Sequence, residues 1–235
     1  SNNDFSFKIN KRFKINDFKL DSKVSIKELS VSNKLGLKKF LPNVKNNLNF
    51  LDHVLSIRYT KDDFNVTGKG NILIQEKYDV LTYEIKKKND FIDFKTLLKI
   101  DNNPLKIDYL NYKKQKALIR LKGSRNEKKE ILIKNLSIDE KKNQIQIKNL
   151  RLNKKLKIIE LGTINLDYID NENQKNQIRL SPIKDGYILD GPFFNANKFI
   201  DDLLSDNSNA SYFDINTKIK INIDRVRLDN QNSLF

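Results

Sequence analysis

The sequence has no cysteine, a single histidine, and few of the residues that usually make turns. Without cysteine the chain can form neither disulfides nor thiolate metal sites. A common metal site needs two or three imidazoles, and only His53 is present. Seven glycines and four prolines are few for a chain of β-strands, so the turns are expected to use Asn, Asp and Lys. No run of 18 apolar residues occurs, the length that a transmembrane helix requires.

No group of side chains has the spacing of a catalytic or phosphate-binding site. The carboxylates of Asp62 and Asp63 point apart on a strand, and those of Asp201 and Asp202 diverge on a helix. The segment 68–70, Gly-Lys-Gly, is too short for a phosphate loop and is more typical of a bulge or tight bend in a strand. His53 is expected in a partly exposed loop. The sequence therefore predicts no enzyme, no cofactor and no metal.

The formal charge of +15 could indicate nucleic acid or an anionic membrane as partner. Of the 45 basic residues, however, 37 are Lys and only 8 are Arg, whereas base recognition favours Arg. The aromatic residues alternate onto the apolar side of the strands, not onto an exposed basic surface. A solvated basic face fits best, attraction to anionic lipid headgroups is second, and nucleic acid is not expected as a partner.

Strict alternation of apolar and polar residues dominates the sequence, most clearly over residues 54–123. In the segment 91–100, Phe94 and Leu98 fall on one face of a strand, and Lys95 and Lys99 fall on the other. Six or seven consecutive strands are predicted there, forming a sheet that is apolar on one side. The residues expected to line that side are Leu55, Ile57, Tyr59, Ile72, Ile74, Leu81, Tyr83, Ile85, Ile92, Phe94, Leu98, Ile100, Leu105, Ile107, Tyr109, Ile119 and Leu121.

The same pattern extends in both directions and is interrupted once. We expect first strands within residues 1–42, a loop or single turn at 43–53, a central sheet over 54–190, and further strands over 212–235. Phe213, Ile215, Ile219 and Ile221 belong to the longest alternation and are predicted to continue the apolar face, with Lys220 in water. Residues 195–205 instead show helical spacing, so a helix is expected to pack on the apolar face. Its buried residues should be Phe199, Ile200, Leu203 and Leu204.

Two architectures satisfy this pattern. About 16 strands at about 4.8 Å each give a sheet roughly 75 Å across, and open sheets that wide curl or split into two layers. The first expectation is a mainly β chain whose twisted antiparallel sheet curls into an open groove, or half-pipe. The alternative is a β-sandwich whose layers bury the apolar faces against each other. Both ends fall in strand pattern, so a fragment of a longer chain is expected.

Several short segments over residues 40–204 occur in a characteristic order. They are Leu41-Pro42, Leu55 to Tyr59, Phe64 to Gly70, Asn103 to Lys114, Ala117 to Gly123, and Tyr187 to Ala196. This order of features resembles the AsmA-like proteins of the bacterial envelope (the AsmA/TamB/YhdP group). At the last junction such proteins often show Gly and then Phe-Asp-Ala, whereas Asn195 stands here at the Asp position.

The resemblance implies a periplasmic protein that is anchored to the inner membrane in its full-length form. Its long β-groove would carry phospholipid towards the outer membrane and so serve outer-membrane biogenesis. The ligands would be phospholipid acyl chains, and contacts with both membranes would come from parts outside this chain. The competing expectation is a structural or adhesive module of the cell envelope without lipid transport.

Overall fold

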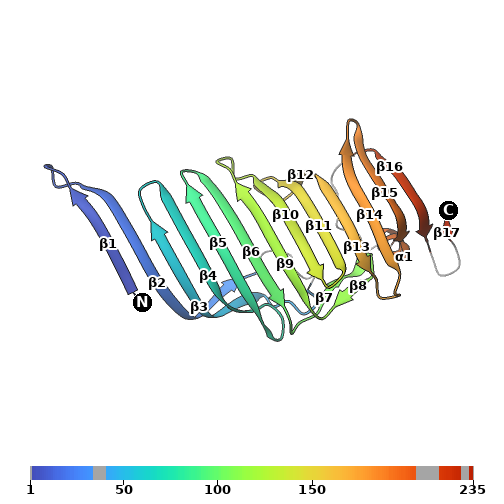
Figure 1. Cartoon of the computed structure of the whole chain (residues 1–235), viewed down its shortest axis with the longest axis horizontal. Coiled ribbons are helices and arrows are strands. Elements are labelled where there is room, and N and C mark those ends of the chain that lie inside the picture. The colour runs from blue at the N-terminus through green and yellow to red at the C-terminus, as the bar shows by residue number, and fades with distance from the viewer. Residues whose placement is uncertain (1, 34–40, 205–216, 229–232, 235) are drawn as a thin grey trace.

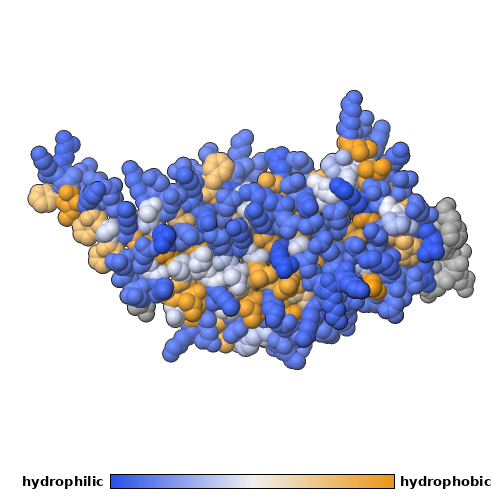
Figure 2. Space-filling model, in the orientation of Figure 1, coloured by the Kyte–Doolittle hydropathy of each residue, from blue (hydrophilic) through white to orange (hydrophobic). Residues whose placement is uncertain are grey.

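The computed structural model describes residues 2–33, 41–204, 217–228 and 233–234. Most of these residues belong to one long sheet that is not closed into a barrel, with β1 and β17 at opposite ends of the molecule (Figure 1). The order along the sheet is β1-β2-β3-β4-β5-β6-β9-β10-β11-β13-β14-β15-β16-β17, and β12 pairs with β11 beside this path. The face seen in Figure 2 is largely hydrophilic, with hydrophobic side chains in patches between the charged ones.

The strands of this sheet follow the chain almost in order. Their bounds are β1 (Asn2–Ile9), β2 (Ile15–Ser32), β3 (Asn47–Tyr59), β4 (Asp63–Leu73), β5 (Tyr78–Lys88), β6 (Phe91–Ile100), β9 (Ala117–Arg125), β10 (Ile131–Glu140), β11 (Asn143–Leu152), β12 (Ile158–Glu160), β13 (Thr163–Ile169), β14 (Lys175–Ile183), β15 (Gly186–Asn195), β16 (Ile219–Arg227) and β17 (Ser233–Leu234).

The predicted mainly β fold with one short helix is confirmed, but the sheet is mixed and not wholly antiparallel. β15 and β16 are parallel, with Leu189 opposite Ile221. The helix α1 (Asn197–Leu204) lies between these two strands in the sequence. Parallel neighbours need a crossover connection, and the only α-helix among the described residues lies in this one.

The prediction of unbroken strands over residues 54–123 is wrong in one place. Between β6 and β9 the chain leaves the sheet and forms β7 (Leu105–Ile107), the 3-10 helix η2 (Asp108–Leu110) and β8 (Tyr112–Lys114). The strands β7 and β8 pair with each other and not with the long sheet. Leu105, Ile107 and Tyr109 therefore do not lie on the long sheet. Leu105 and Ile107 are buried beneath it, because this segment supplies a second layer that period-two alternation cannot distinguish from another strand.

The second layer covers only one edge of the sheet. Leu41, Val44, the β7–η2–β8 segment and α1 pack against the strand ends that carry Ile72, Ile100, Ala117, Tyr168 and Phe194. This cluster is the hydrophobic core. The expected loop at 43–53 is partly wrong, since β3 begins at Asn47 and its residue Leu48 joins this core.

Two further predictions concern the helix α1 and His53. α1 starts two residues later than predicted, and its Ile200 packs against the core while Phe199 stays 37% exposed. Phe213 and Ile215, and the side chains of Leu203 and Leu204, lie outside the described residues.

His53 is 1% exposed within β3, not in a loop. Among the described residues no helix has the length and apolar character needed to cross a membrane.

Candidate functional site

One row of directly paired residues crosses the apolar face of the sheet. The paired residues from β2 to β16 are Val24, Leu55, Gly68, Tyr83, Thr96, Leu121, Leu136, Ile147, Ile164, Leu180, Leu189 and Ile221. Directly paired residues on neighbouring strands point to the same side of a sheet. Eleven strand-to-strand steps of about 4.8 Å make this row roughly 50 Å long.

The row marks the boundary between a covered and an uncovered part of the face. On the lower side of the row, towards the second layer, Ile72, Ile100 and Tyr168 are buried. On the upper side, away from the second layer, Phe94, Val66 and Ile133 are only half-buried, and Ile85 is exposed. We call this upper part, together with the row itself, the uncovered face. An apolar surface of this extent is rarely left open on a soluble protein unless it serves binding.

The structure separates the predicted lining residues into distinct groups. The alternation in β6 is confirmed, because Phe94 and Leu98 share a face that Lys95 and Lys99 do not. Ile219 and Ile221 follow Leu189 on that face at the far end of the sheet and are 54% and 66% exposed. On the uncovered face lie Leu55, Ile57, Tyr59, Tyr83, Ile85, Ile92, Phe94 and Leu121. Packed within or against the covered core are Ile72, Ile74, Leu81, Leu98, Ile100 and Ile119.

Only four of the twelve row positions, Leu55, Tyr83, Leu121 and Ile221, were among the predicted lining residues. Gly68 and Thr96 lie between predicted positions, and the other six are half-buried apolar residues: Val24, Leu136, Ile147, Ile164, Leu180 and Leu189. They lie in segments whose alternation is as regular as that of residues 91–100, for example Ile145 with Ile147 and Ile164 with Leu166. Alternation shows which residues share a face of one strand, but only the register between strands joins those faces into one surface.

Aromatic rings on this face lie over glycines of the neighbouring strand. A Cβ at Gly68 would overlap the Tyr83 ring, and one at Gly123 would overlap the Phe94 ring. Gly70 gives the same room to His53, whose Nε2 donates a hydrogen bond to the Asn71 carbonyl at 2.9 Å. The two glycines at 68 and 70 therefore accommodate rings. The bulge expected there lies in the neighbouring strand β3, between Leu51 and Val54.

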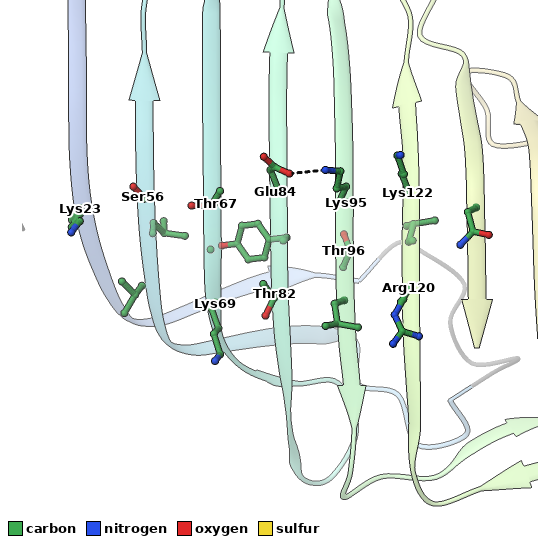
Figure 3. A pocket seen from close by; sticks show the side chains of 17 residues that line it. Lys23, Ser56, Thr67, Lys69, Thr82, Glu84, Lys95, Thr96, Arg120 and Lys122 are labelled. Atoms are coloured by element: carbon green, nitrogen blue, oxygen red, sulfur yellow. Dashed lines mark ion pairs between the residues drawn. The ribbon is translucent and has the colours of Figure 1, made fainter. Parts of the chain in front are cut away.

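The opposite face is hydrophilic and contains a shallow hollow of about 870 Å³ (Figure 3). Val54 and Leu97 are among the residues that line it. Lys23, Lys69 and Lys122 are among its cations (Figure 3). Its single carboxylate, Glu84, lies 2.7 Å from the Lys86 Nζ and 3.3 Å from the Lys95 Nζ. These two ammonium groups lower the pKa of Glu84. Glu84 is thus an ion-pair partner, not a proton acceptor prepared for catalysis.

A metal site formed by the described residues of either face would require several ligand side chains close together. Within the described ranges no three His, Cys, Asp or Glu residues lie close enough together to hold a metal ion. Burial raises the pKa of Tyr83 on the uncovered face, and of Tyr112 and Tyr168 in the core, so all three phenols stay neutral at ordinary pH. What the site offers is an extended apolar surface with hydrophilic strand faces behind it.

Comparisons of the chain with protein-family models, with curated proteins and with solved structures found no match. The residues and geometry described above are therefore the basis for a functional assignment.

Proposed function

We propose that the uncovered face binds the acyl chains of phospholipids, and that this chain is a segment of a lipid-conducting bridge between the two membranes of a bacterial envelope. The observation that carries the proposal is the row of paired residues that crosses the sheet from β2 to β16, apolar at every position except Gly68 and Thr96. Each CH₂ that such a surface removes from water contributes about 0.8 kcal/mol. A surface that binds by burial alone needs no polar recognition group, which fits the side chains found there.

In this proposal the sheet curls so that the uncovered face forms the inside of an open groove. Register shifts at Leu51/Val54 in β3, at Ile133/Asn135 in β10, and between β14 and β15, where β15 has the extra residue, support the curl, because bulges bend and twist the strands that carry them. Headgroups would remain at the open upper side in water. The resemblance to AsmA-like proteins adds a periplasmic location with an inner-membrane anchor, in parts of the protein outside this chain.

The alternative is a structural or adhesive module of the envelope. A β-sandwich of that kind would bury the apolar row under a second sheet. Among the described residues the only other sheet is the β7–β8 pair, which belongs to the covered edge. Half-buried residues such as Phe94 and Leu121 therefore favour a surface that takes up a ligand.

A photoreactive amino acid placed on each face in turn tests the proposal. Phe94 and Lys95 are neighbours on β6 with opposite orientations, so the two positions differ in face and in little else. After illumination in the presence of phospholipid, the probe at Phe94 should capture lipid and the probe at Lys95 should not. Equal capture at both positions, or capture at neither, would contradict lipid binding by this face and favour the structural module.

A further inference from the structure

Two hairpin turns on one edge of the sheet have nearly the same sequence. Residues 9–15 read Ile-Asn-Lys-Arg-Phe-Lys-Ile and residues 152–158 read Leu-Asn-Lys-Lys-Leu-Lys-Ile. We call them the first and second basic tips. In both, an apolar pair on the adjoining strands, Ile9 with Ile15 and Leu152 with Ile158, closes the turn.

The two tips also share one backbone design. In the first tip, the Asn10 side-chain oxygen accepts hydrogen bonds from the backbone N–H groups of Arg12 at 2.9 Å and Lys14 at 3.1 Å. In the second, the Asn153 side-chain oxygen accepts from Lys155 at 2.8 Å and Lys157 at 3.1 Å. These hydrogen bonds hold in place the residue between the two donors, Phe13 in the first tip and Leu156 in the second.

The fourth residue of each turn is unusual for its backbone conformation. Phe13 has φ 57° and Leu156 has φ 62°, in the left-handed region that Gly and Asn prefer and that bulky apolar residues avoid. The chain uses the conventional choice in a turn of the same design at 170–174, where Asn173 has φ 60°. The apolar choice in the two basic tips thus opposes the local conformational preference, a pattern found mostly at functional positions.

Both apolar side chains project into solvent and are surrounded by cations. Phe13 is 90% exposed and Leu156 is 52% exposed. Three basic residues accompany each of them within the turn: Lys11, Arg12 and Lys14 in the first tip, and Lys154, Lys155 and Lys157 in the second. Neither tip contains a carboxylate.

The strand pairing places both tips on the same edge. Every pair from β1 to β13 is antiparallel, so the turn after β1 and the turn after β11 lie at the same ends of their strands. This is the upper edge in Figure 1, opposite the edge that the second layer covers. Eight strand-to-strand steps separate the tips, roughly 40 Å of sheet.

We infer that the two basic tips dock this edge of the sheet onto a membrane surface that contains anionic lipids. Phe13 and Leu156 enter the interface between headgroups and acyl chains, and the lysines and Arg12 meet the lipid phosphates. A bilayer with anionic lipids has negatively charged headgroups above an apolar interior at every point of its surface. Two tips that lie far apart can therefore bind it at the same time. The inference goes beyond the proposed function, because it concerns the edge of the sheet and not the uncovered face.

The absence of tryptophan from the sequence makes insertion directly measurable. The variants Phe13→Trp, Leu156→Trp and Asn173→Trp each carry one fluorophore in a turn of the same design, the last on the opposite edge. With phosphatidylcholine vesicles that contain roughly one-third phosphatidylglycerol, emission of the first two should shift to the blue and be quenched by brominated lipid, and that of the third should not. Raising the salt concentration should weaken binding.

The double variant Phe13→Asn/Leu156→Asn tests the need for the apolar side chains. Asn suits the left-handed conformation, so the turns remain formed while vesicle binding in co-sedimentation should fall by about tenfold or more. The control Lys129→Asn replaces a residue of φ 62° in a turn on the same edge and should change binding by less than about twofold.

Any of three results would overturn the inference. The double variant could bind vesicles as well as the unchanged protein, or Phe13→Trp and Asn173→Trp could show equal blue shifts. The third result is that the tips bind an acidic protein and do not bind vesicles. Lipid capture by the probe at Phe94 reports only on the uncovered face, so the two proposals can fail separately.

Discussion

The smallest residues of the uncovered face decide how its largest ones lie. Gly68 and Gly123 have no side chain, and the rings of Tyr83 and Phe94 occupy the vacant space above them. Each ring thus fills space that a side chain on the neighbouring strand would otherwise occupy. Sequence reasoning found the alternation that places Tyr83 and Phe94 on this face but could not pair each ring with its glycine, because that contact depends on the register between strands.

Replacing Gly68 by Ala should therefore destabilise the protein through Tyr83 alone. The new methyl group overlaps the end of the Tyr83 ring and no other side chain at comparable distance, so we expect a loss of about 1–3 kcal/mol in urea unfolding. In a Tyr83→Val background, where the ring is absent, Gly68→Ala should cost less than about 0.5 kcal/mol. Equal costs in both backgrounds would show that the backbone, and not the ring, requires glycine.

At the scale of elements, a buried polar cluster joins β13, β14, β15 and β16 beside α1. Asp170, Asn176 and Asn195 are each at most 3% exposed. The Asn195 side-chain amide donates to the Asp170 carboxylate at 2.8 Å, and the Asn176 side-chain oxygen accepts from the Asn195 backbone N–H at 2.7 Å. The Ala196 N–H donates to the Arg227 carbonyl at 2.8 Å, which ties β15 to the end of β16.

This cluster gives a physical reason for Asn at position 195, where the resemblance led us to expect Asp. A carboxylate at 195 would lie buried against that of Asp170, with no proton to donate. Asn195→Asp should therefore cost roughly 2–4 kcal/mol at pH 7. Repulsion and burial raise the pKa of the new carboxyl, so its charged form is disfavoured in the folded state and the loss should shrink as the pH falls towards 5. Urea unfolding at both pH values measures this.

The exchange Asp170→Asn/Asn195→Asp is the matched control. Asn can hold the turn at 170, as Asn10 and Asn153 do in turns of the same design. The double variant restores an amide facing a carboxylate and should recover most of the lost stability. A double variant as unstable as the sum of its parts would mean that the pairing of Asn195 with Asp170 does not explain the choice of Asn.

Elements built from local pattern could be predicted, and those that depend on distant partners could not. The strand around Phe94 and Leu98 follows from alternation alone, and α1 follows from its helical spacing. Leu105, Ile107 and Tyr109 alternate equally well, yet their segment forms the second layer, where Tyr168 donates a hydrogen bond to the Leu110 carbonyl at 3.0 Å. The parallel pairing of β15 with β16 likewise depends on where the chain returns after α1. In the candidate site, side-chain faces were predictable and the continuous row was not.

Considered as a whole, the described part of the molecule is an open sheet with a second layer along one edge and none along the other. The core lies where the second layer meets the lower strand ends, so we expect stability to depend less on the upper part of the apolar face. That separation allows the uncovered face to be altered with limited loss of stability. This arrangement decides which substitutions on the apolar face can test lipid binding. Leu98 and Ile119 pack against the core, so a charge there would test folding. Leu121 lies in the row, outside the core, and is the better position.

Leu121→Glu and Leu97→Glu form a matched pair for the final test. Leu121 faces the apolar side opposite Thr96, and Leu97 faces the hydrophilic side opposite Arg120, on the same two strands. Leu97 is already 36% exposed, so its replacement should change neither stability nor lipid uptake appreciably. A carboxylate at 121 interrupts the apolar row, and since transfer of an unpaired charge into hydrocarbon is strongly unfavourable, acyl chains should no longer pass it. With photoreactive probes on either side, at Tyr83 and at Ile164, lipid supplied from one end should reach only the nearer probe. Capture at both probes in Leu121→Glu, as in Leu97→Glu, would mean that lipid does not travel along this row.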